Sequence, residues 1–573
     1  MKILSLHCDY LKFKPVKKAL KEPEALSEKQ KKSKEIKECL VIFIAVEKGD
    51  DLNLAKKLVE NIQDIANQVK AKKIVLYPYA HLSSQLASPD IAISVMKEAE
   101  QELRKIKKYE VIRAPFGYYK EFELKCKGHP LAELSREIRE EGSEGEKGKE
   151  KITERYDYKQ LLRQISKSKL DARKLKDNDH RILGEKLNLF SFSETAPGMV
   201  FWHNNGLIIY NELVKFWREE HKKSGYEEIS TPEILDKKLW QISGHWEKYR
   251  ENIFLTKYEG RDFAVKPMNC PGGMLIFKHS TKSYKDFPLR VAELGVVHRQ
   301  ELSGVLAGLF RVIKFTQDDA HIFCADENQV EQEVGAVIEM VEKFYKKTFK
   351  FPYHIELSTK PEKRIGTDTQ WSTAEKILNK VLKKKKIKYK LNKGEGAFYG
   401  PKIDFHIKDS LGRTWQTATI QLDFAMPERF NLEYTDKDNK KKQPIMIHRA
   451  IYGSLERFIG VLLEHLNGNL PTWLSPIQVR VLSFTDRNKK SAEKILKALQ
   501  EQGLRADADF ESTSVSEKVR TAEIQKIPYM IVIGDKEQKS KTLAVRARGK
   551  KPKFKVKLEK FLKDIKKEIN ERK

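Results

Sequence analysis

The sequence predicts a multidomain chain of mixed α/β and α+β class, with an antiparallel sheet in its central part. Its 573 residues are enough for about four domains of ~150 residues each. A charged stretch with recurring glycines, 138–178, separates two regions that contain apolar segments. Residues 298–321 carry apolar and β-branched side chains on both sides of a loop with Gly304 and Gly308, which is typical of two antiparallel strands.

The first region, 1–137, is predicted to form one α/β unit. Its apolar runs are short and suit buried strands, while the segments between them have the spacing of amphipathic helices. We expect strands at 2–6, 40–46, 74–77 and from 114–120, and helices at 53–71 and 91–103.

The second region, 179–475, opens with an amphipathic helix at 205–224, which Gly225 ends before a strand at 226–232. After residue 476 strands alternate with helices, which predicts a small α/β sheet. The strands of this sheet are expected at 479–484, 505–510, 529–533 and 543–546, and its helices at 491–502 and 516–525.

The composition limits the partners and the compartment. There are 111 Lys and Arg against 82 Asp and Glu, a formal net charge of +29, which favours a polyanionic partner, although a lysine-rich proteome would give the same excess. Five scattered cysteines indicate a reducing compartment instead of a disulfide framework. No apolar run approaches the ~20 residues of a membrane span, and the first residues do not resemble a signal peptide. We therefore expect a cytoplasmic protein without a membrane partner.

The hairpin at 298–321 contains several charged and potentially metal-binding side chains. Arg311 and Lys314 supply two cations, and Asp318, Asp319 and His321 supply carboxylates and an imidazole at the other end. Such a hairpin suits a triphosphate at one end and a metal or an amine at the other. An ordinary amphipathic hairpin with surface charges would show the same pattern.

Several longer motifs carry a resemblance to a known family. Arg299 with Glu301, followed by an antiparallel return and a later GSLER at 453–457, resembles motifs 2 and 3 of class II aminoacyl-tRNA synthetases. From residue 179 onward the chain resembles threonyl-tRNA synthetases, on KPMNCPGG (266–273), FTQDDAH (315–321), GEGAFYGPKID (394–404), TIQLDF (419–424) and MIHRAIYGSLERFIG (446–460). The first region resembles the editing domain of the archaeal-type enzymes, on ILSLHCDYLKF, YPYAHLSS, APFGYYK and CKGHPLAELS.

The resemblance implies a division of labour along the chain. It assigns 1–137 to an editing domain like the D-aminoacyl-tRNA deacylases, 138–178 to a charged linker, 179–475 to the catalytic domain and 476–573 to an anticodon-binding domain. The implied activity is that of a threonine–tRNA ligase, which forms threonyl-adenylate from ATP and L-threonine, charges tRNA(Thr) and hydrolyses mischarged seryl-tRNA(Thr). A homodimer built on the helix at 205–224 is also implied, although a helix buried within a monomer would show the same pattern, and no DNA partner is expected. Two alternatives stay open: another class II synthetase, such as the prolyl enzyme, and a catalytically inactive paralogue that binds RNA.

Three residues match the zinc ligands of the family: Cys270, His321 and His448. Each alone is a common structural residue, a buried thiol or a core histidine. Together they would hold one Zn²⁺ per subunit with a fourth position open. In the family, a zinc ion with an open position binds the amino and hydroxyl groups of threonine. Valine has no hydroxyl group and is therefore rejected. Serine lacks only a methyl group, worth ~1–3 kcal/mol, which explains why a separate editing domain is needed.

The nucleotide and the remaining substrate contacts fall on other matched residues. Arg299 is implied to bind the α-phosphate and Arg457 the γ-phosphate, with Mg²⁺ bridging phosphates. Other residues match positions that hold the nucleotide, the threonine or its adenylate: Glu301, Arg311, Gln317, Asp319, Tyr399, Lys402 and Gln421. His245, between Gly244 and Trp246, matches a residue beside the terminal ribose of tRNA. Two departures from the family pattern stand near the site, Gly273 in place of a polar residue and Ile313-Lys314 in place of Arg-Gly.

Two smaller sets of residues are implied for the outer domains. The editing pocket would contain His81, Tyr119, Lys120 and Glu133, where Lys120 steadies the tRNA end and the developing oxyanion. Glu537 and Arg546 match anticodon contacts. Surface positions without chemistry would explain each of these residues singly. Cys8 stands where the family often has serine, and we do not assign it the role of a nucleophile.

Overall fold

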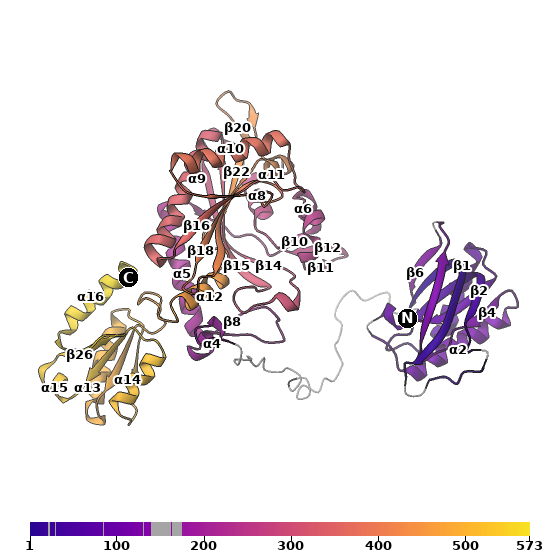
Figure 1. Ribbon diagram of the computed structural model, residues 1–573, viewed down its shortest axis with the longest axis horizontal. Helices are drawn as coiled ribbons and strands as arrows, with labels where there is room; N and C mark the ends of the chain where they lie inside the picture. The colour runs from indigo at the N-terminus through magenta and orange to yellow at the C-terminus, as the bar shows by residue number, and fades with distance from the viewer. Residues whose placement is uncertain (21–22, 29, 84, 130, 139–161, 163–174) are drawn as a thin grey trace. The chain divides into compact units, whose positions relative to one another are not determined.

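The computed structural model describes the chain except residues 21–22, 29, 84, 130, 139–161 and 163–174 (Figure 1). It divides into two compact units, Met1–Arg155 and Tyr156–Lys573, which are described separately. Most of the predicted linker at 138–178 lies outside the described residues. None of the helices that the described residues form has the length and apolar character needed to cross a membrane.

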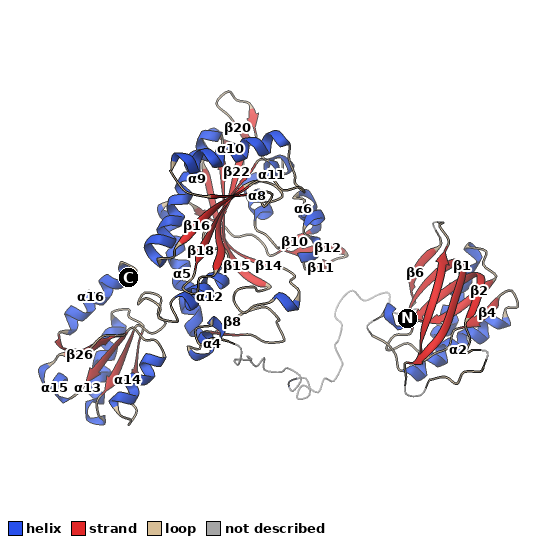
Figure 2. Ribbon diagram, in the orientation of Figure 1, coloured by secondary structure: helices blue, strands red, loops and turns tan. Residues whose placement is uncertain are grey.

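The first unit is a six-stranded sheet with helices on one face (Figure 2). The strand order is β4-β3-β2-β1-β5, and β6 also pairs with β1. Helices α1 (Leu54–Gln68) and α2 (Pro89–Lys105) bury their apolar stripes against one face. The strands are β1 (Lys2–Lys18), β2 (Lys34–Ala45), β3 (Lys73–Pro78), β4 (Glu110–Arg113), β5 (Tyr118–Cys126) and β6 (Glu133–Glu137). The predicted α/β unit is confirmed.

Strand β1 is much longer than the predicted strand at 2–6. It continues to Lys18 and pairs in an antiparallel sense with β2, β5 and β6. Cys8, Leu11 and Phe13 are buried on the face opposite the helices, and a register shift between Cys8 and Tyr10 keeps them inward. The bulge breaks the alternation of buried and exposed side chains, and polar residues interrupt the apolar pattern. The second half of the strand was therefore not predicted from the sequence.

The second unit is built on an eight-stranded sheet whose six inner strands are antiparallel, in the order β16-β18-β19-β22-β15-β14. This confirms the predicted antiparallel sheet. Its strands are β9 (Glu227–Glu228), β14 (Leu289–His298), β15 (Lys314–Cys324), β16 (Tyr353–Ser358), β17 (Lys390–Asn392), β18 (Lys402–Lys408), β19 (Thr414–Asp423) and β22 (Ile445–Ala450). The predicted hairpin is β14 and β15, although β15 begins at Lys314, which leaves Arg311 in the connecting loop.

One face of this sheet is covered by helices and forms the main core. The covering helices are α5 (Asn204–Lys223), α9 (Glu327–Glu342), α10 (Asp368–Lys384) and α12 (Leu455–His465). Ile322, Ile420 and Ile447 point into this core from β15, β19 and β22. Because neighbouring side chains on a strand alternate, the residues next to them face the opposite side of the sheet.

The C-terminal part of this unit carries a separate five-stranded sheet, ordered β24-β23-β25-β26-β27. Its strands are β23 (Val479–Ser483), β24 (Ala506–Asp509), β25 (Tyr529–Ile533), β26 (Leu543–Ala547) and β27 (Lys553–Val556), with helices α13 (Lys489–Glu501), α14 (Val515–Ile524) and α16 (Leu558–Asn570). The small α/β sheet is confirmed. The Lys-rich segment after Lys550 forms β27 and α16, whose Phe561 and Ile565 are buried. Both sheets belong to one compact unit, so the boundary at 475 remains a prediction. The boundaries at 137 and 178 also remain predictions.

Candidate functional site

The uncovered face of the eight-stranded sheet gathers the polar residues of several distant motifs. Lys402 pairs with Gln421 across β18 and β19, and Gln421 pairs with His448 across β19 and β22. His448 in turn pairs with His321 across β22 and β15. Four strands therefore place these side chains in one row, on the side away from the helical core.

Two residues of this row, His321 and His448, form a buried cluster with Cys270. Cys270 begins helix α8 (Cys270–Lys278), and the two histidines are cross-strand neighbours with ring centroids 5.0 Å apart. The candidate ligand atoms of all three residues lie within 4.8 Å of one another. The structure thus brings the three predicted ligands together, although up to 178 positions of sequence separate them.

The donor atoms of this cluster fit a zinc ion. His321 Nε2 is buried and has no hydrogen-bond partner, and burial lowers the pKa of this imidazole well below its usual value. His448 Nε2 lies 2.8 Å from Asp423 Oδ2, which leaves Nδ1 for a metal. Burial also raises the pKa of the Cys270 thiol, so a cation is needed to stabilise its thiolate. Two neutral imidazoles and one thiol are typical zinc ligands.

Two further predicted residues, Tyr399 and Asp319, lie beside this cluster. The Tyr399 hydroxyl donates to Gln421 Oε1, and its ring lies 4.9 Å from that of His448. Asp319 Oδ2 is 3.8 Å from His321 Nε2, and burial raises the pKa of Asp319 to about 6. Lys402 pairs with Asp404 at 2.8 Å. Polar side chains from three strands and the loop before β18 therefore lie on the same sheet face as the metal-binding cluster.

The predicted phosphate-binding arginines converge at the loop between β14 and β15. Arg299 donates to the Pro267 carbonyl at 3.2 Å, and Arg457 donates from Nε to the Phe310 carbonyl at 2.9 Å. Burial, together with the charges of Arg299 and Arg311, lowers the pKa of Arg457. Arg311 pairs with Glu301 at 2.8 Å. Like charges held this close favour an anionic ligand.

Gln317 and His245 occupy different environments. Gln317 forms a bridge with Ser454, at the turn before helix α12. His245 is fully buried, with Nδ1 2.7 Å from Ser243 Oγ and Nε2 2.8 Å from Met268 Sδ. Burial lowers the pKa of His245 to about 3, so its ring is neutral. In this structure His245 is not exposed to a ligand.

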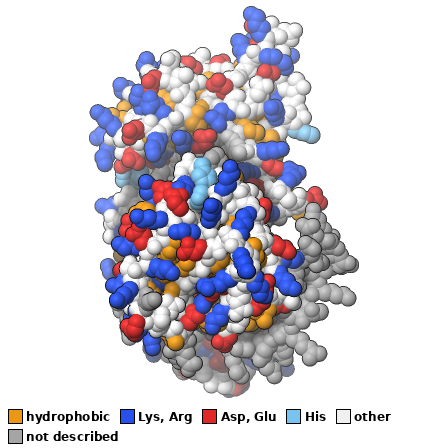
Figure 3. Space-filling view, turned by 90° about the vertical axis from the view of Figure 1, so that its right-hand side faces the viewer, with side chains coloured by type: hydrophobic (Ala, Val, Ile, Leu, Met, Phe, Trp, Pro, Cys, Tyr) orange, Lys and Arg blue, Asp and Glu red, His pale blue; other side chains and the backbone are white. Residues whose placement is uncertain are grey.

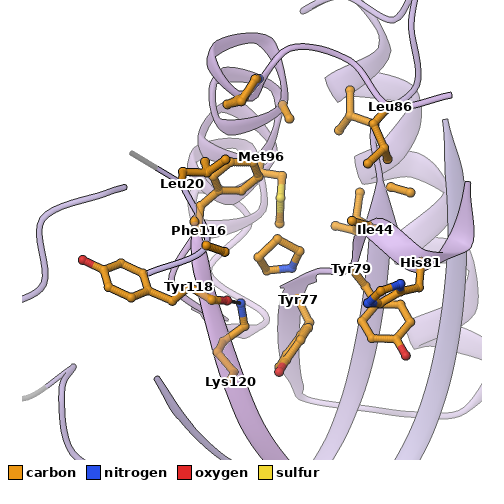
Figure 4. A pocket seen from close by; sticks show the side chains of 18 of the residues that line it. Leu20, Ile44, Tyr77, Tyr79, His81, Leu86, Met96, Phe116, Tyr118 and Lys120 are labelled. Carbon is orange, nitrogen blue, oxygen red and sulfur yellow. Dashed lines mark hydrogen bonds between the residues drawn. The ribbon is translucent and has the colours of Figure 1, made fainter. Parts of the chain in front are cut away.

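The first unit contains a pocket of about 400 Å³, shown in Figure 4. Its walls are largely apolar, with Leu20, Ile44 and Phe116 among them. Three of the four predicted editing residues line it: His81, Tyr119 and Lys120. Glu133 is not among the lining residues and is exposed on β6, opposite Leu6.

Lys120 is held firmly at the wall of this pocket. Its Nζ donates to the carbonyls of Pro115 and Tyr118, at 3.0 and 3.1 Å, and lies 5.0 Å from the centre of the Tyr77 ring. Burial lowers the pKa of Lys120 to about 8. Cys8 is buried elsewhere in the same unit, and burial raises its pKa to about 12, so it carries no thiolate at neutral pH.

The two predicted anticodon residues each have a partner within the protein. Glu537 accepts the Gly534 amide at 3.1 Å, at the start of helix α15 (Asp535–Ser540). Arg546 on β26 pairs with Glu523 at 2.8 Å. Their roles remain predictions.

Two carboxylates, Asp423 and Asp318, have structural roles in the site that the sequence did not predict, although Asp318 was already noted as a carboxylate of the hairpin. Asp423 orients His448, and Asp318 accepts the amides of Ile451, Tyr452 and Gly453 at 2.8–3.0 Å. Asp318 thereby fixes the turn that leads to Arg457. Both lie inside recognised motifs, TIQLDF and FTQDDAH, so the motifs were a usable signal for them.

Comparison with known proteins agrees with this architecture. Three family models match: the archaea-specific editing domain of threonyl-tRNA synthetase at 1–138, the class II tRNA synthetase core domain (G, H, P, S and T) at 254–466, and an anticodon binding domain at 478–568. A solved structure described as putative threonyl-tRNA synthetase ThrRS-1 from Aeropyrum pernix is 31% identical, with a TM-score of 0.62 over 69% of this chain and 97% of that one. The chain belongs to the threonyl-tRNA synthetase family.

Other threonyl-tRNA synthetases support this membership. The RNA binding domain of the enzyme from Cryptosporidium parvum Iowa II is 40% identical, with a TM-score of 0.66 over 68% of this chain and 98% of that one. The threonine–tRNA ligase of Caldanaerobacter subterraneus subsp. tengcongensis is 53% identical over 394 residues, 69% of this chain and 61% of that protein. The chain thus spans about three fifths of the length of the curated relatives that it matches. The predicted family is confirmed.

Proposed function

We propose that the chain is a threonine–tRNA ligase that forms threonyl-adenylate, transfers threonine to tRNA(Thr) and hydrolyses seryl-tRNA(Thr). The observation that carries this proposal is the cluster of Cys270, His321 and His448. It occurs in the same unit as three arginines, Arg299, Arg311 and Arg457, that lie close enough to influence one another's charge. In this proposal the editing domain is 1–137, the linker 138–178, the catalytic domain 179–475 and the anticodon-binding domain 476–573.

The metal-binding cluster would select the amino acid. When bound, one zinc ion per subunit would supply an open position for the amino and hydroxyl groups of threonine. Asp423 orients His448 through the 2.8 Å contact, and the hydrogen-bonded pair of Tyr399 and Gln421 limits the room beside it. Asp319, on the same face, supplies a carboxylate for the threonine ammonium group. Serine has the same amino and hydroxyl groups and lacks only a methyl group, so this site would distinguish it from threonine weakly.

The arginine side of the site would bind ATP with Mg²⁺. Arg299 would contact the α-phosphate, where negative charge increases as the threonine carboxylate attacks. Arg457 would contact the γ-phosphate, and Arg311 with Glu301 would hold the nucleotide. Gln317 and Lys402 would border the space between nucleotide and amino acid. We retain His245 as the residue beside the tRNA terminal ribose, although it is buried and would have to become exposed to contact it.

The pocket of the first unit would remove serine from mischarged tRNA. Its apolar walls suit a small aminoacyl group, and Lys120 stands where a cation can steady the tRNA end and a developing oxyanion. His81 and Tyr119 line the same pocket. We retain Glu133 as a candidate, although a change of position would be needed before it reached the pocket.

The remaining partners follow from the same proposal. Figure 3 shows Lys and Arg side chains over much of the face that it draws, with Asp and Glu among them. The excess positive charge suits the phosphate backbone of tRNA, and Glu537 and Arg546 would contact the anticodon. We also propose a homodimer that pairs through α5 and β9, and a cytoplasmic location, where tRNA charging takes place.

The test is amino-acid-dependent exchange between ATP and pyrophosphate without tRNA. Threonine should support exchange, valine and proline should not, and serine should support it weakly. The purified protein should contain about one zinc per chain. Exchange with proline would favour the prolyl alternative, and no exchange with any amino acid would favour the inactive RNA-binding paralogue.

A further inference from the structure

His180 joins two parts of the second unit through both of its ring nitrogens. It begins helix α4 (His180–Lys186) and is only 1% exposed. Its Nδ1 lies 2.6 Å from Glu464 Oε1, and its Nε2 accepts the Leu309 amide at 3.0 Å. Because a backbone amide only donates, Nε2 carries no proton and Nδ1 donates to Glu464. The ring therefore connects helix α12 to the loop between β14 and β15.

That loop, residues 299–313, has an exposed tip and a buried base. Leu302 at the tip is 80% exposed, whereas Leu309 at the base is 0% exposed. A Cβ atom at Gly308 would lie 2.3 Å from His180 Nε2, so only glycine lets the ring approach. The Phe310 ring lies 4.2 Å from the His180 ring. The base is thus shaped to fit this histidine.

The same base determines where two predicted ATP-binding arginines stand. The Phe310 carbonyl accepts Nε of Arg457 at 2.9 Å, and Arg311 is the next residue along the chain. A shift of the Leu309–Phe310 segment would move Arg311 and displace the carbonyl that accepts Arg457. Gly460 of α12 would place a Cβ atom 3.1 Å from Leu309 Cβ and Phe310 Cε1, so the helix packs closely on this segment.

A metal does not explain His180. Suitable ligand atoms of Asp179, His180 and Glu464 lie within 4.8 Å of one another. However, both ring nitrogens of His180 are occupied, and the Asp179 carboxylate accepts the Arg181 side chain at 2.8 and 2.9 Å. Glu464 also pairs with Arg413. The donors are already satisfied within the protein.

We propose that His180 is a positioning residue for the ATP site: by holding the Leu309 amide, it fixes the loop base that aims Arg311 and Arg457 at the triphosphate. The proposal rests on the function proposed above for these arginines. His180 touches no substrate and acts only through the loop. Its absence would leave the Leu309 amide buried without an acceptor, which favours a rearranged loop.

The matched variants are His180→Asn and His180→Gln. An asparagine amide can reach the position of Nδ1 and donate to Glu464, but it leaves Leu309 without an acceptor. A glutamine amide extends to the position of Nε2 and can accept the Leu309 amide. His203→Asn is the control, since His203 also uses both ring nitrogens, towards Asn188 and Ser191, and does not contact the loop.

Threonine-dependent pyrophosphate exchange should separate these variants. His180→Asn should raise KM for ATP about tenfold, the ratio that corresponds to ~1.4 kcal/mol, with KM for threonine and the zinc content unchanged. His180→Gln should recover most of that loss, and His203→Asn should match the wild type. Equal KM values for ATP in all four proteins would overturn the proposal. The proposal would also be overturned if both His180 variants lost activity, threonine binding and zinc to the same extent, since that pattern indicates a general role in folding.

Hydrogen exchange of the wild-type protein supplies a second measurement that does not depend on the variants folding. The Leu309 amide should exchange slowly, and the amides of 302–304 should exchange rapidly. Rapid exchange at Leu309 would overturn the proposal. If the wild type shows no threonine-dependent pyrophosphate exchange, the proposed function fails. Slow hydrogen exchange at the Leu309 amide would still confirm the contact with His180, and His180 would then have a structural role only.

Discussion

His448 Nε2 and Asp423 Oδ2 lie 2.8 Å apart, and both side chains are buried. A carboxylate at Nε2 holds the proton on that nitrogen, so the lone pair of Nδ1 stays free for a metal. The other carboxylate oxygen of Asp423 accepts the amides of Ala425 and Met426, at 2.8 and 3.0 Å. One residue therefore sets the tautomer of a predicted zinc ligand and begins helix α11 (Ala425–Arg429).

Asp423→Asn should weaken zinc binding and leave the fold intact. The remaining amide oxygen can still accept the amides of Ala425 and Met426. The amide NH₂ group, however, would face His448 Nε2 and favour the tautomer that protonates Nδ1. We expect a loss of 10–100-fold in zinc affinity, the usual range for such supporting residues, measured by competition with a chelator. Unchanged affinity would show that His448 does not use Nδ1 for the metal.

Cys270→Ser should remove the bound zinc and threonine activation together. It replaces the one soft ligand of a three-ligand site with a hydroxyl of nearly the same size. The elution volume on gel filtration should stay that of the wild type, because Cys270 lies at the site and not at α5. Metal analysis and threonine-dependent pyrophosphate exchange check both effects. Full exchange activity in a protein without metal would contradict the zinc assignment.

Lys120 should make the stability of the first unit depend on pH. Burial lowers its pKa to about 8 in the folded protein, against ~10.4 for an unperturbed lysine. Below pH 8 the side chain is charged in both states, and its burial lowers stability. Between these two pKa values only the unfolded chain keeps the proton, so the free energy of unfolding should increase with pH.

Lys120→Met has no such group and is the control for this effect. Hydrogen exchange of the β2 and β3 amides at pH 7 and 9.5, corrected for intrinsic rates, measures the free energy of unfolding in both proteins. The wild type should gain stability relative to the variant at the higher pH. A constant difference between them would mean that Lys120 remains charged in the folded unit throughout this range.

The sequence predicted the residues of the metal-binding cluster better than it predicted the surroundings that orient them. Cys270, His321 and His448 lie inside motifs, and strand pairing brings the two histidines together. The contact between His180 and Leu309 spans 129 positions, and neither residue has a pattern that reveals its partner. Long-range contacts of this kind are fixed by packing, which periodicity does not report.

Strand lengths and chain ends were harder to predict for a different reason. The second half of β1 was missed because a bulge and polar residues interrupt its alternation, and α16 was missed because lysines dominate its exposed face. In the first unit, three of the four predicted editing residues line one pocket of the structure, whereas Glu133 lies on β6 and does not line it. A residue carried over from a family keeps its chemistry, while its place depends on the fold around it.

Lys120→Met also tests the proposed editing activity. It removes the cation at the pocket wall with nearly the same side-chain length and changes no residue near Cys270, His321 or His448. Threonylation and zinc content should therefore stay close to those of the wild type. Serine should accumulate on tRNA when it is supplied in excess, because the proposed zinc site distinguishes the two amino acids only by a methyl group.

The measurement is the steady-state level of seryl-tRNA(Thr) in the wild type, in Lys120→Met and in a chain that lacks 1–137. The wild type should hold this level low, and both altered proteins should raise it. A high level in the wild type would mean that the pocket does not edit serine. An increase in the truncated chain alone would keep editing in this unit but assign it to residues other than Lys120. Glu133→Gln and His81→Asn would then be the next variants, since they test whether the exposed carboxylate or the pocket imidazole carries the hydrolysis.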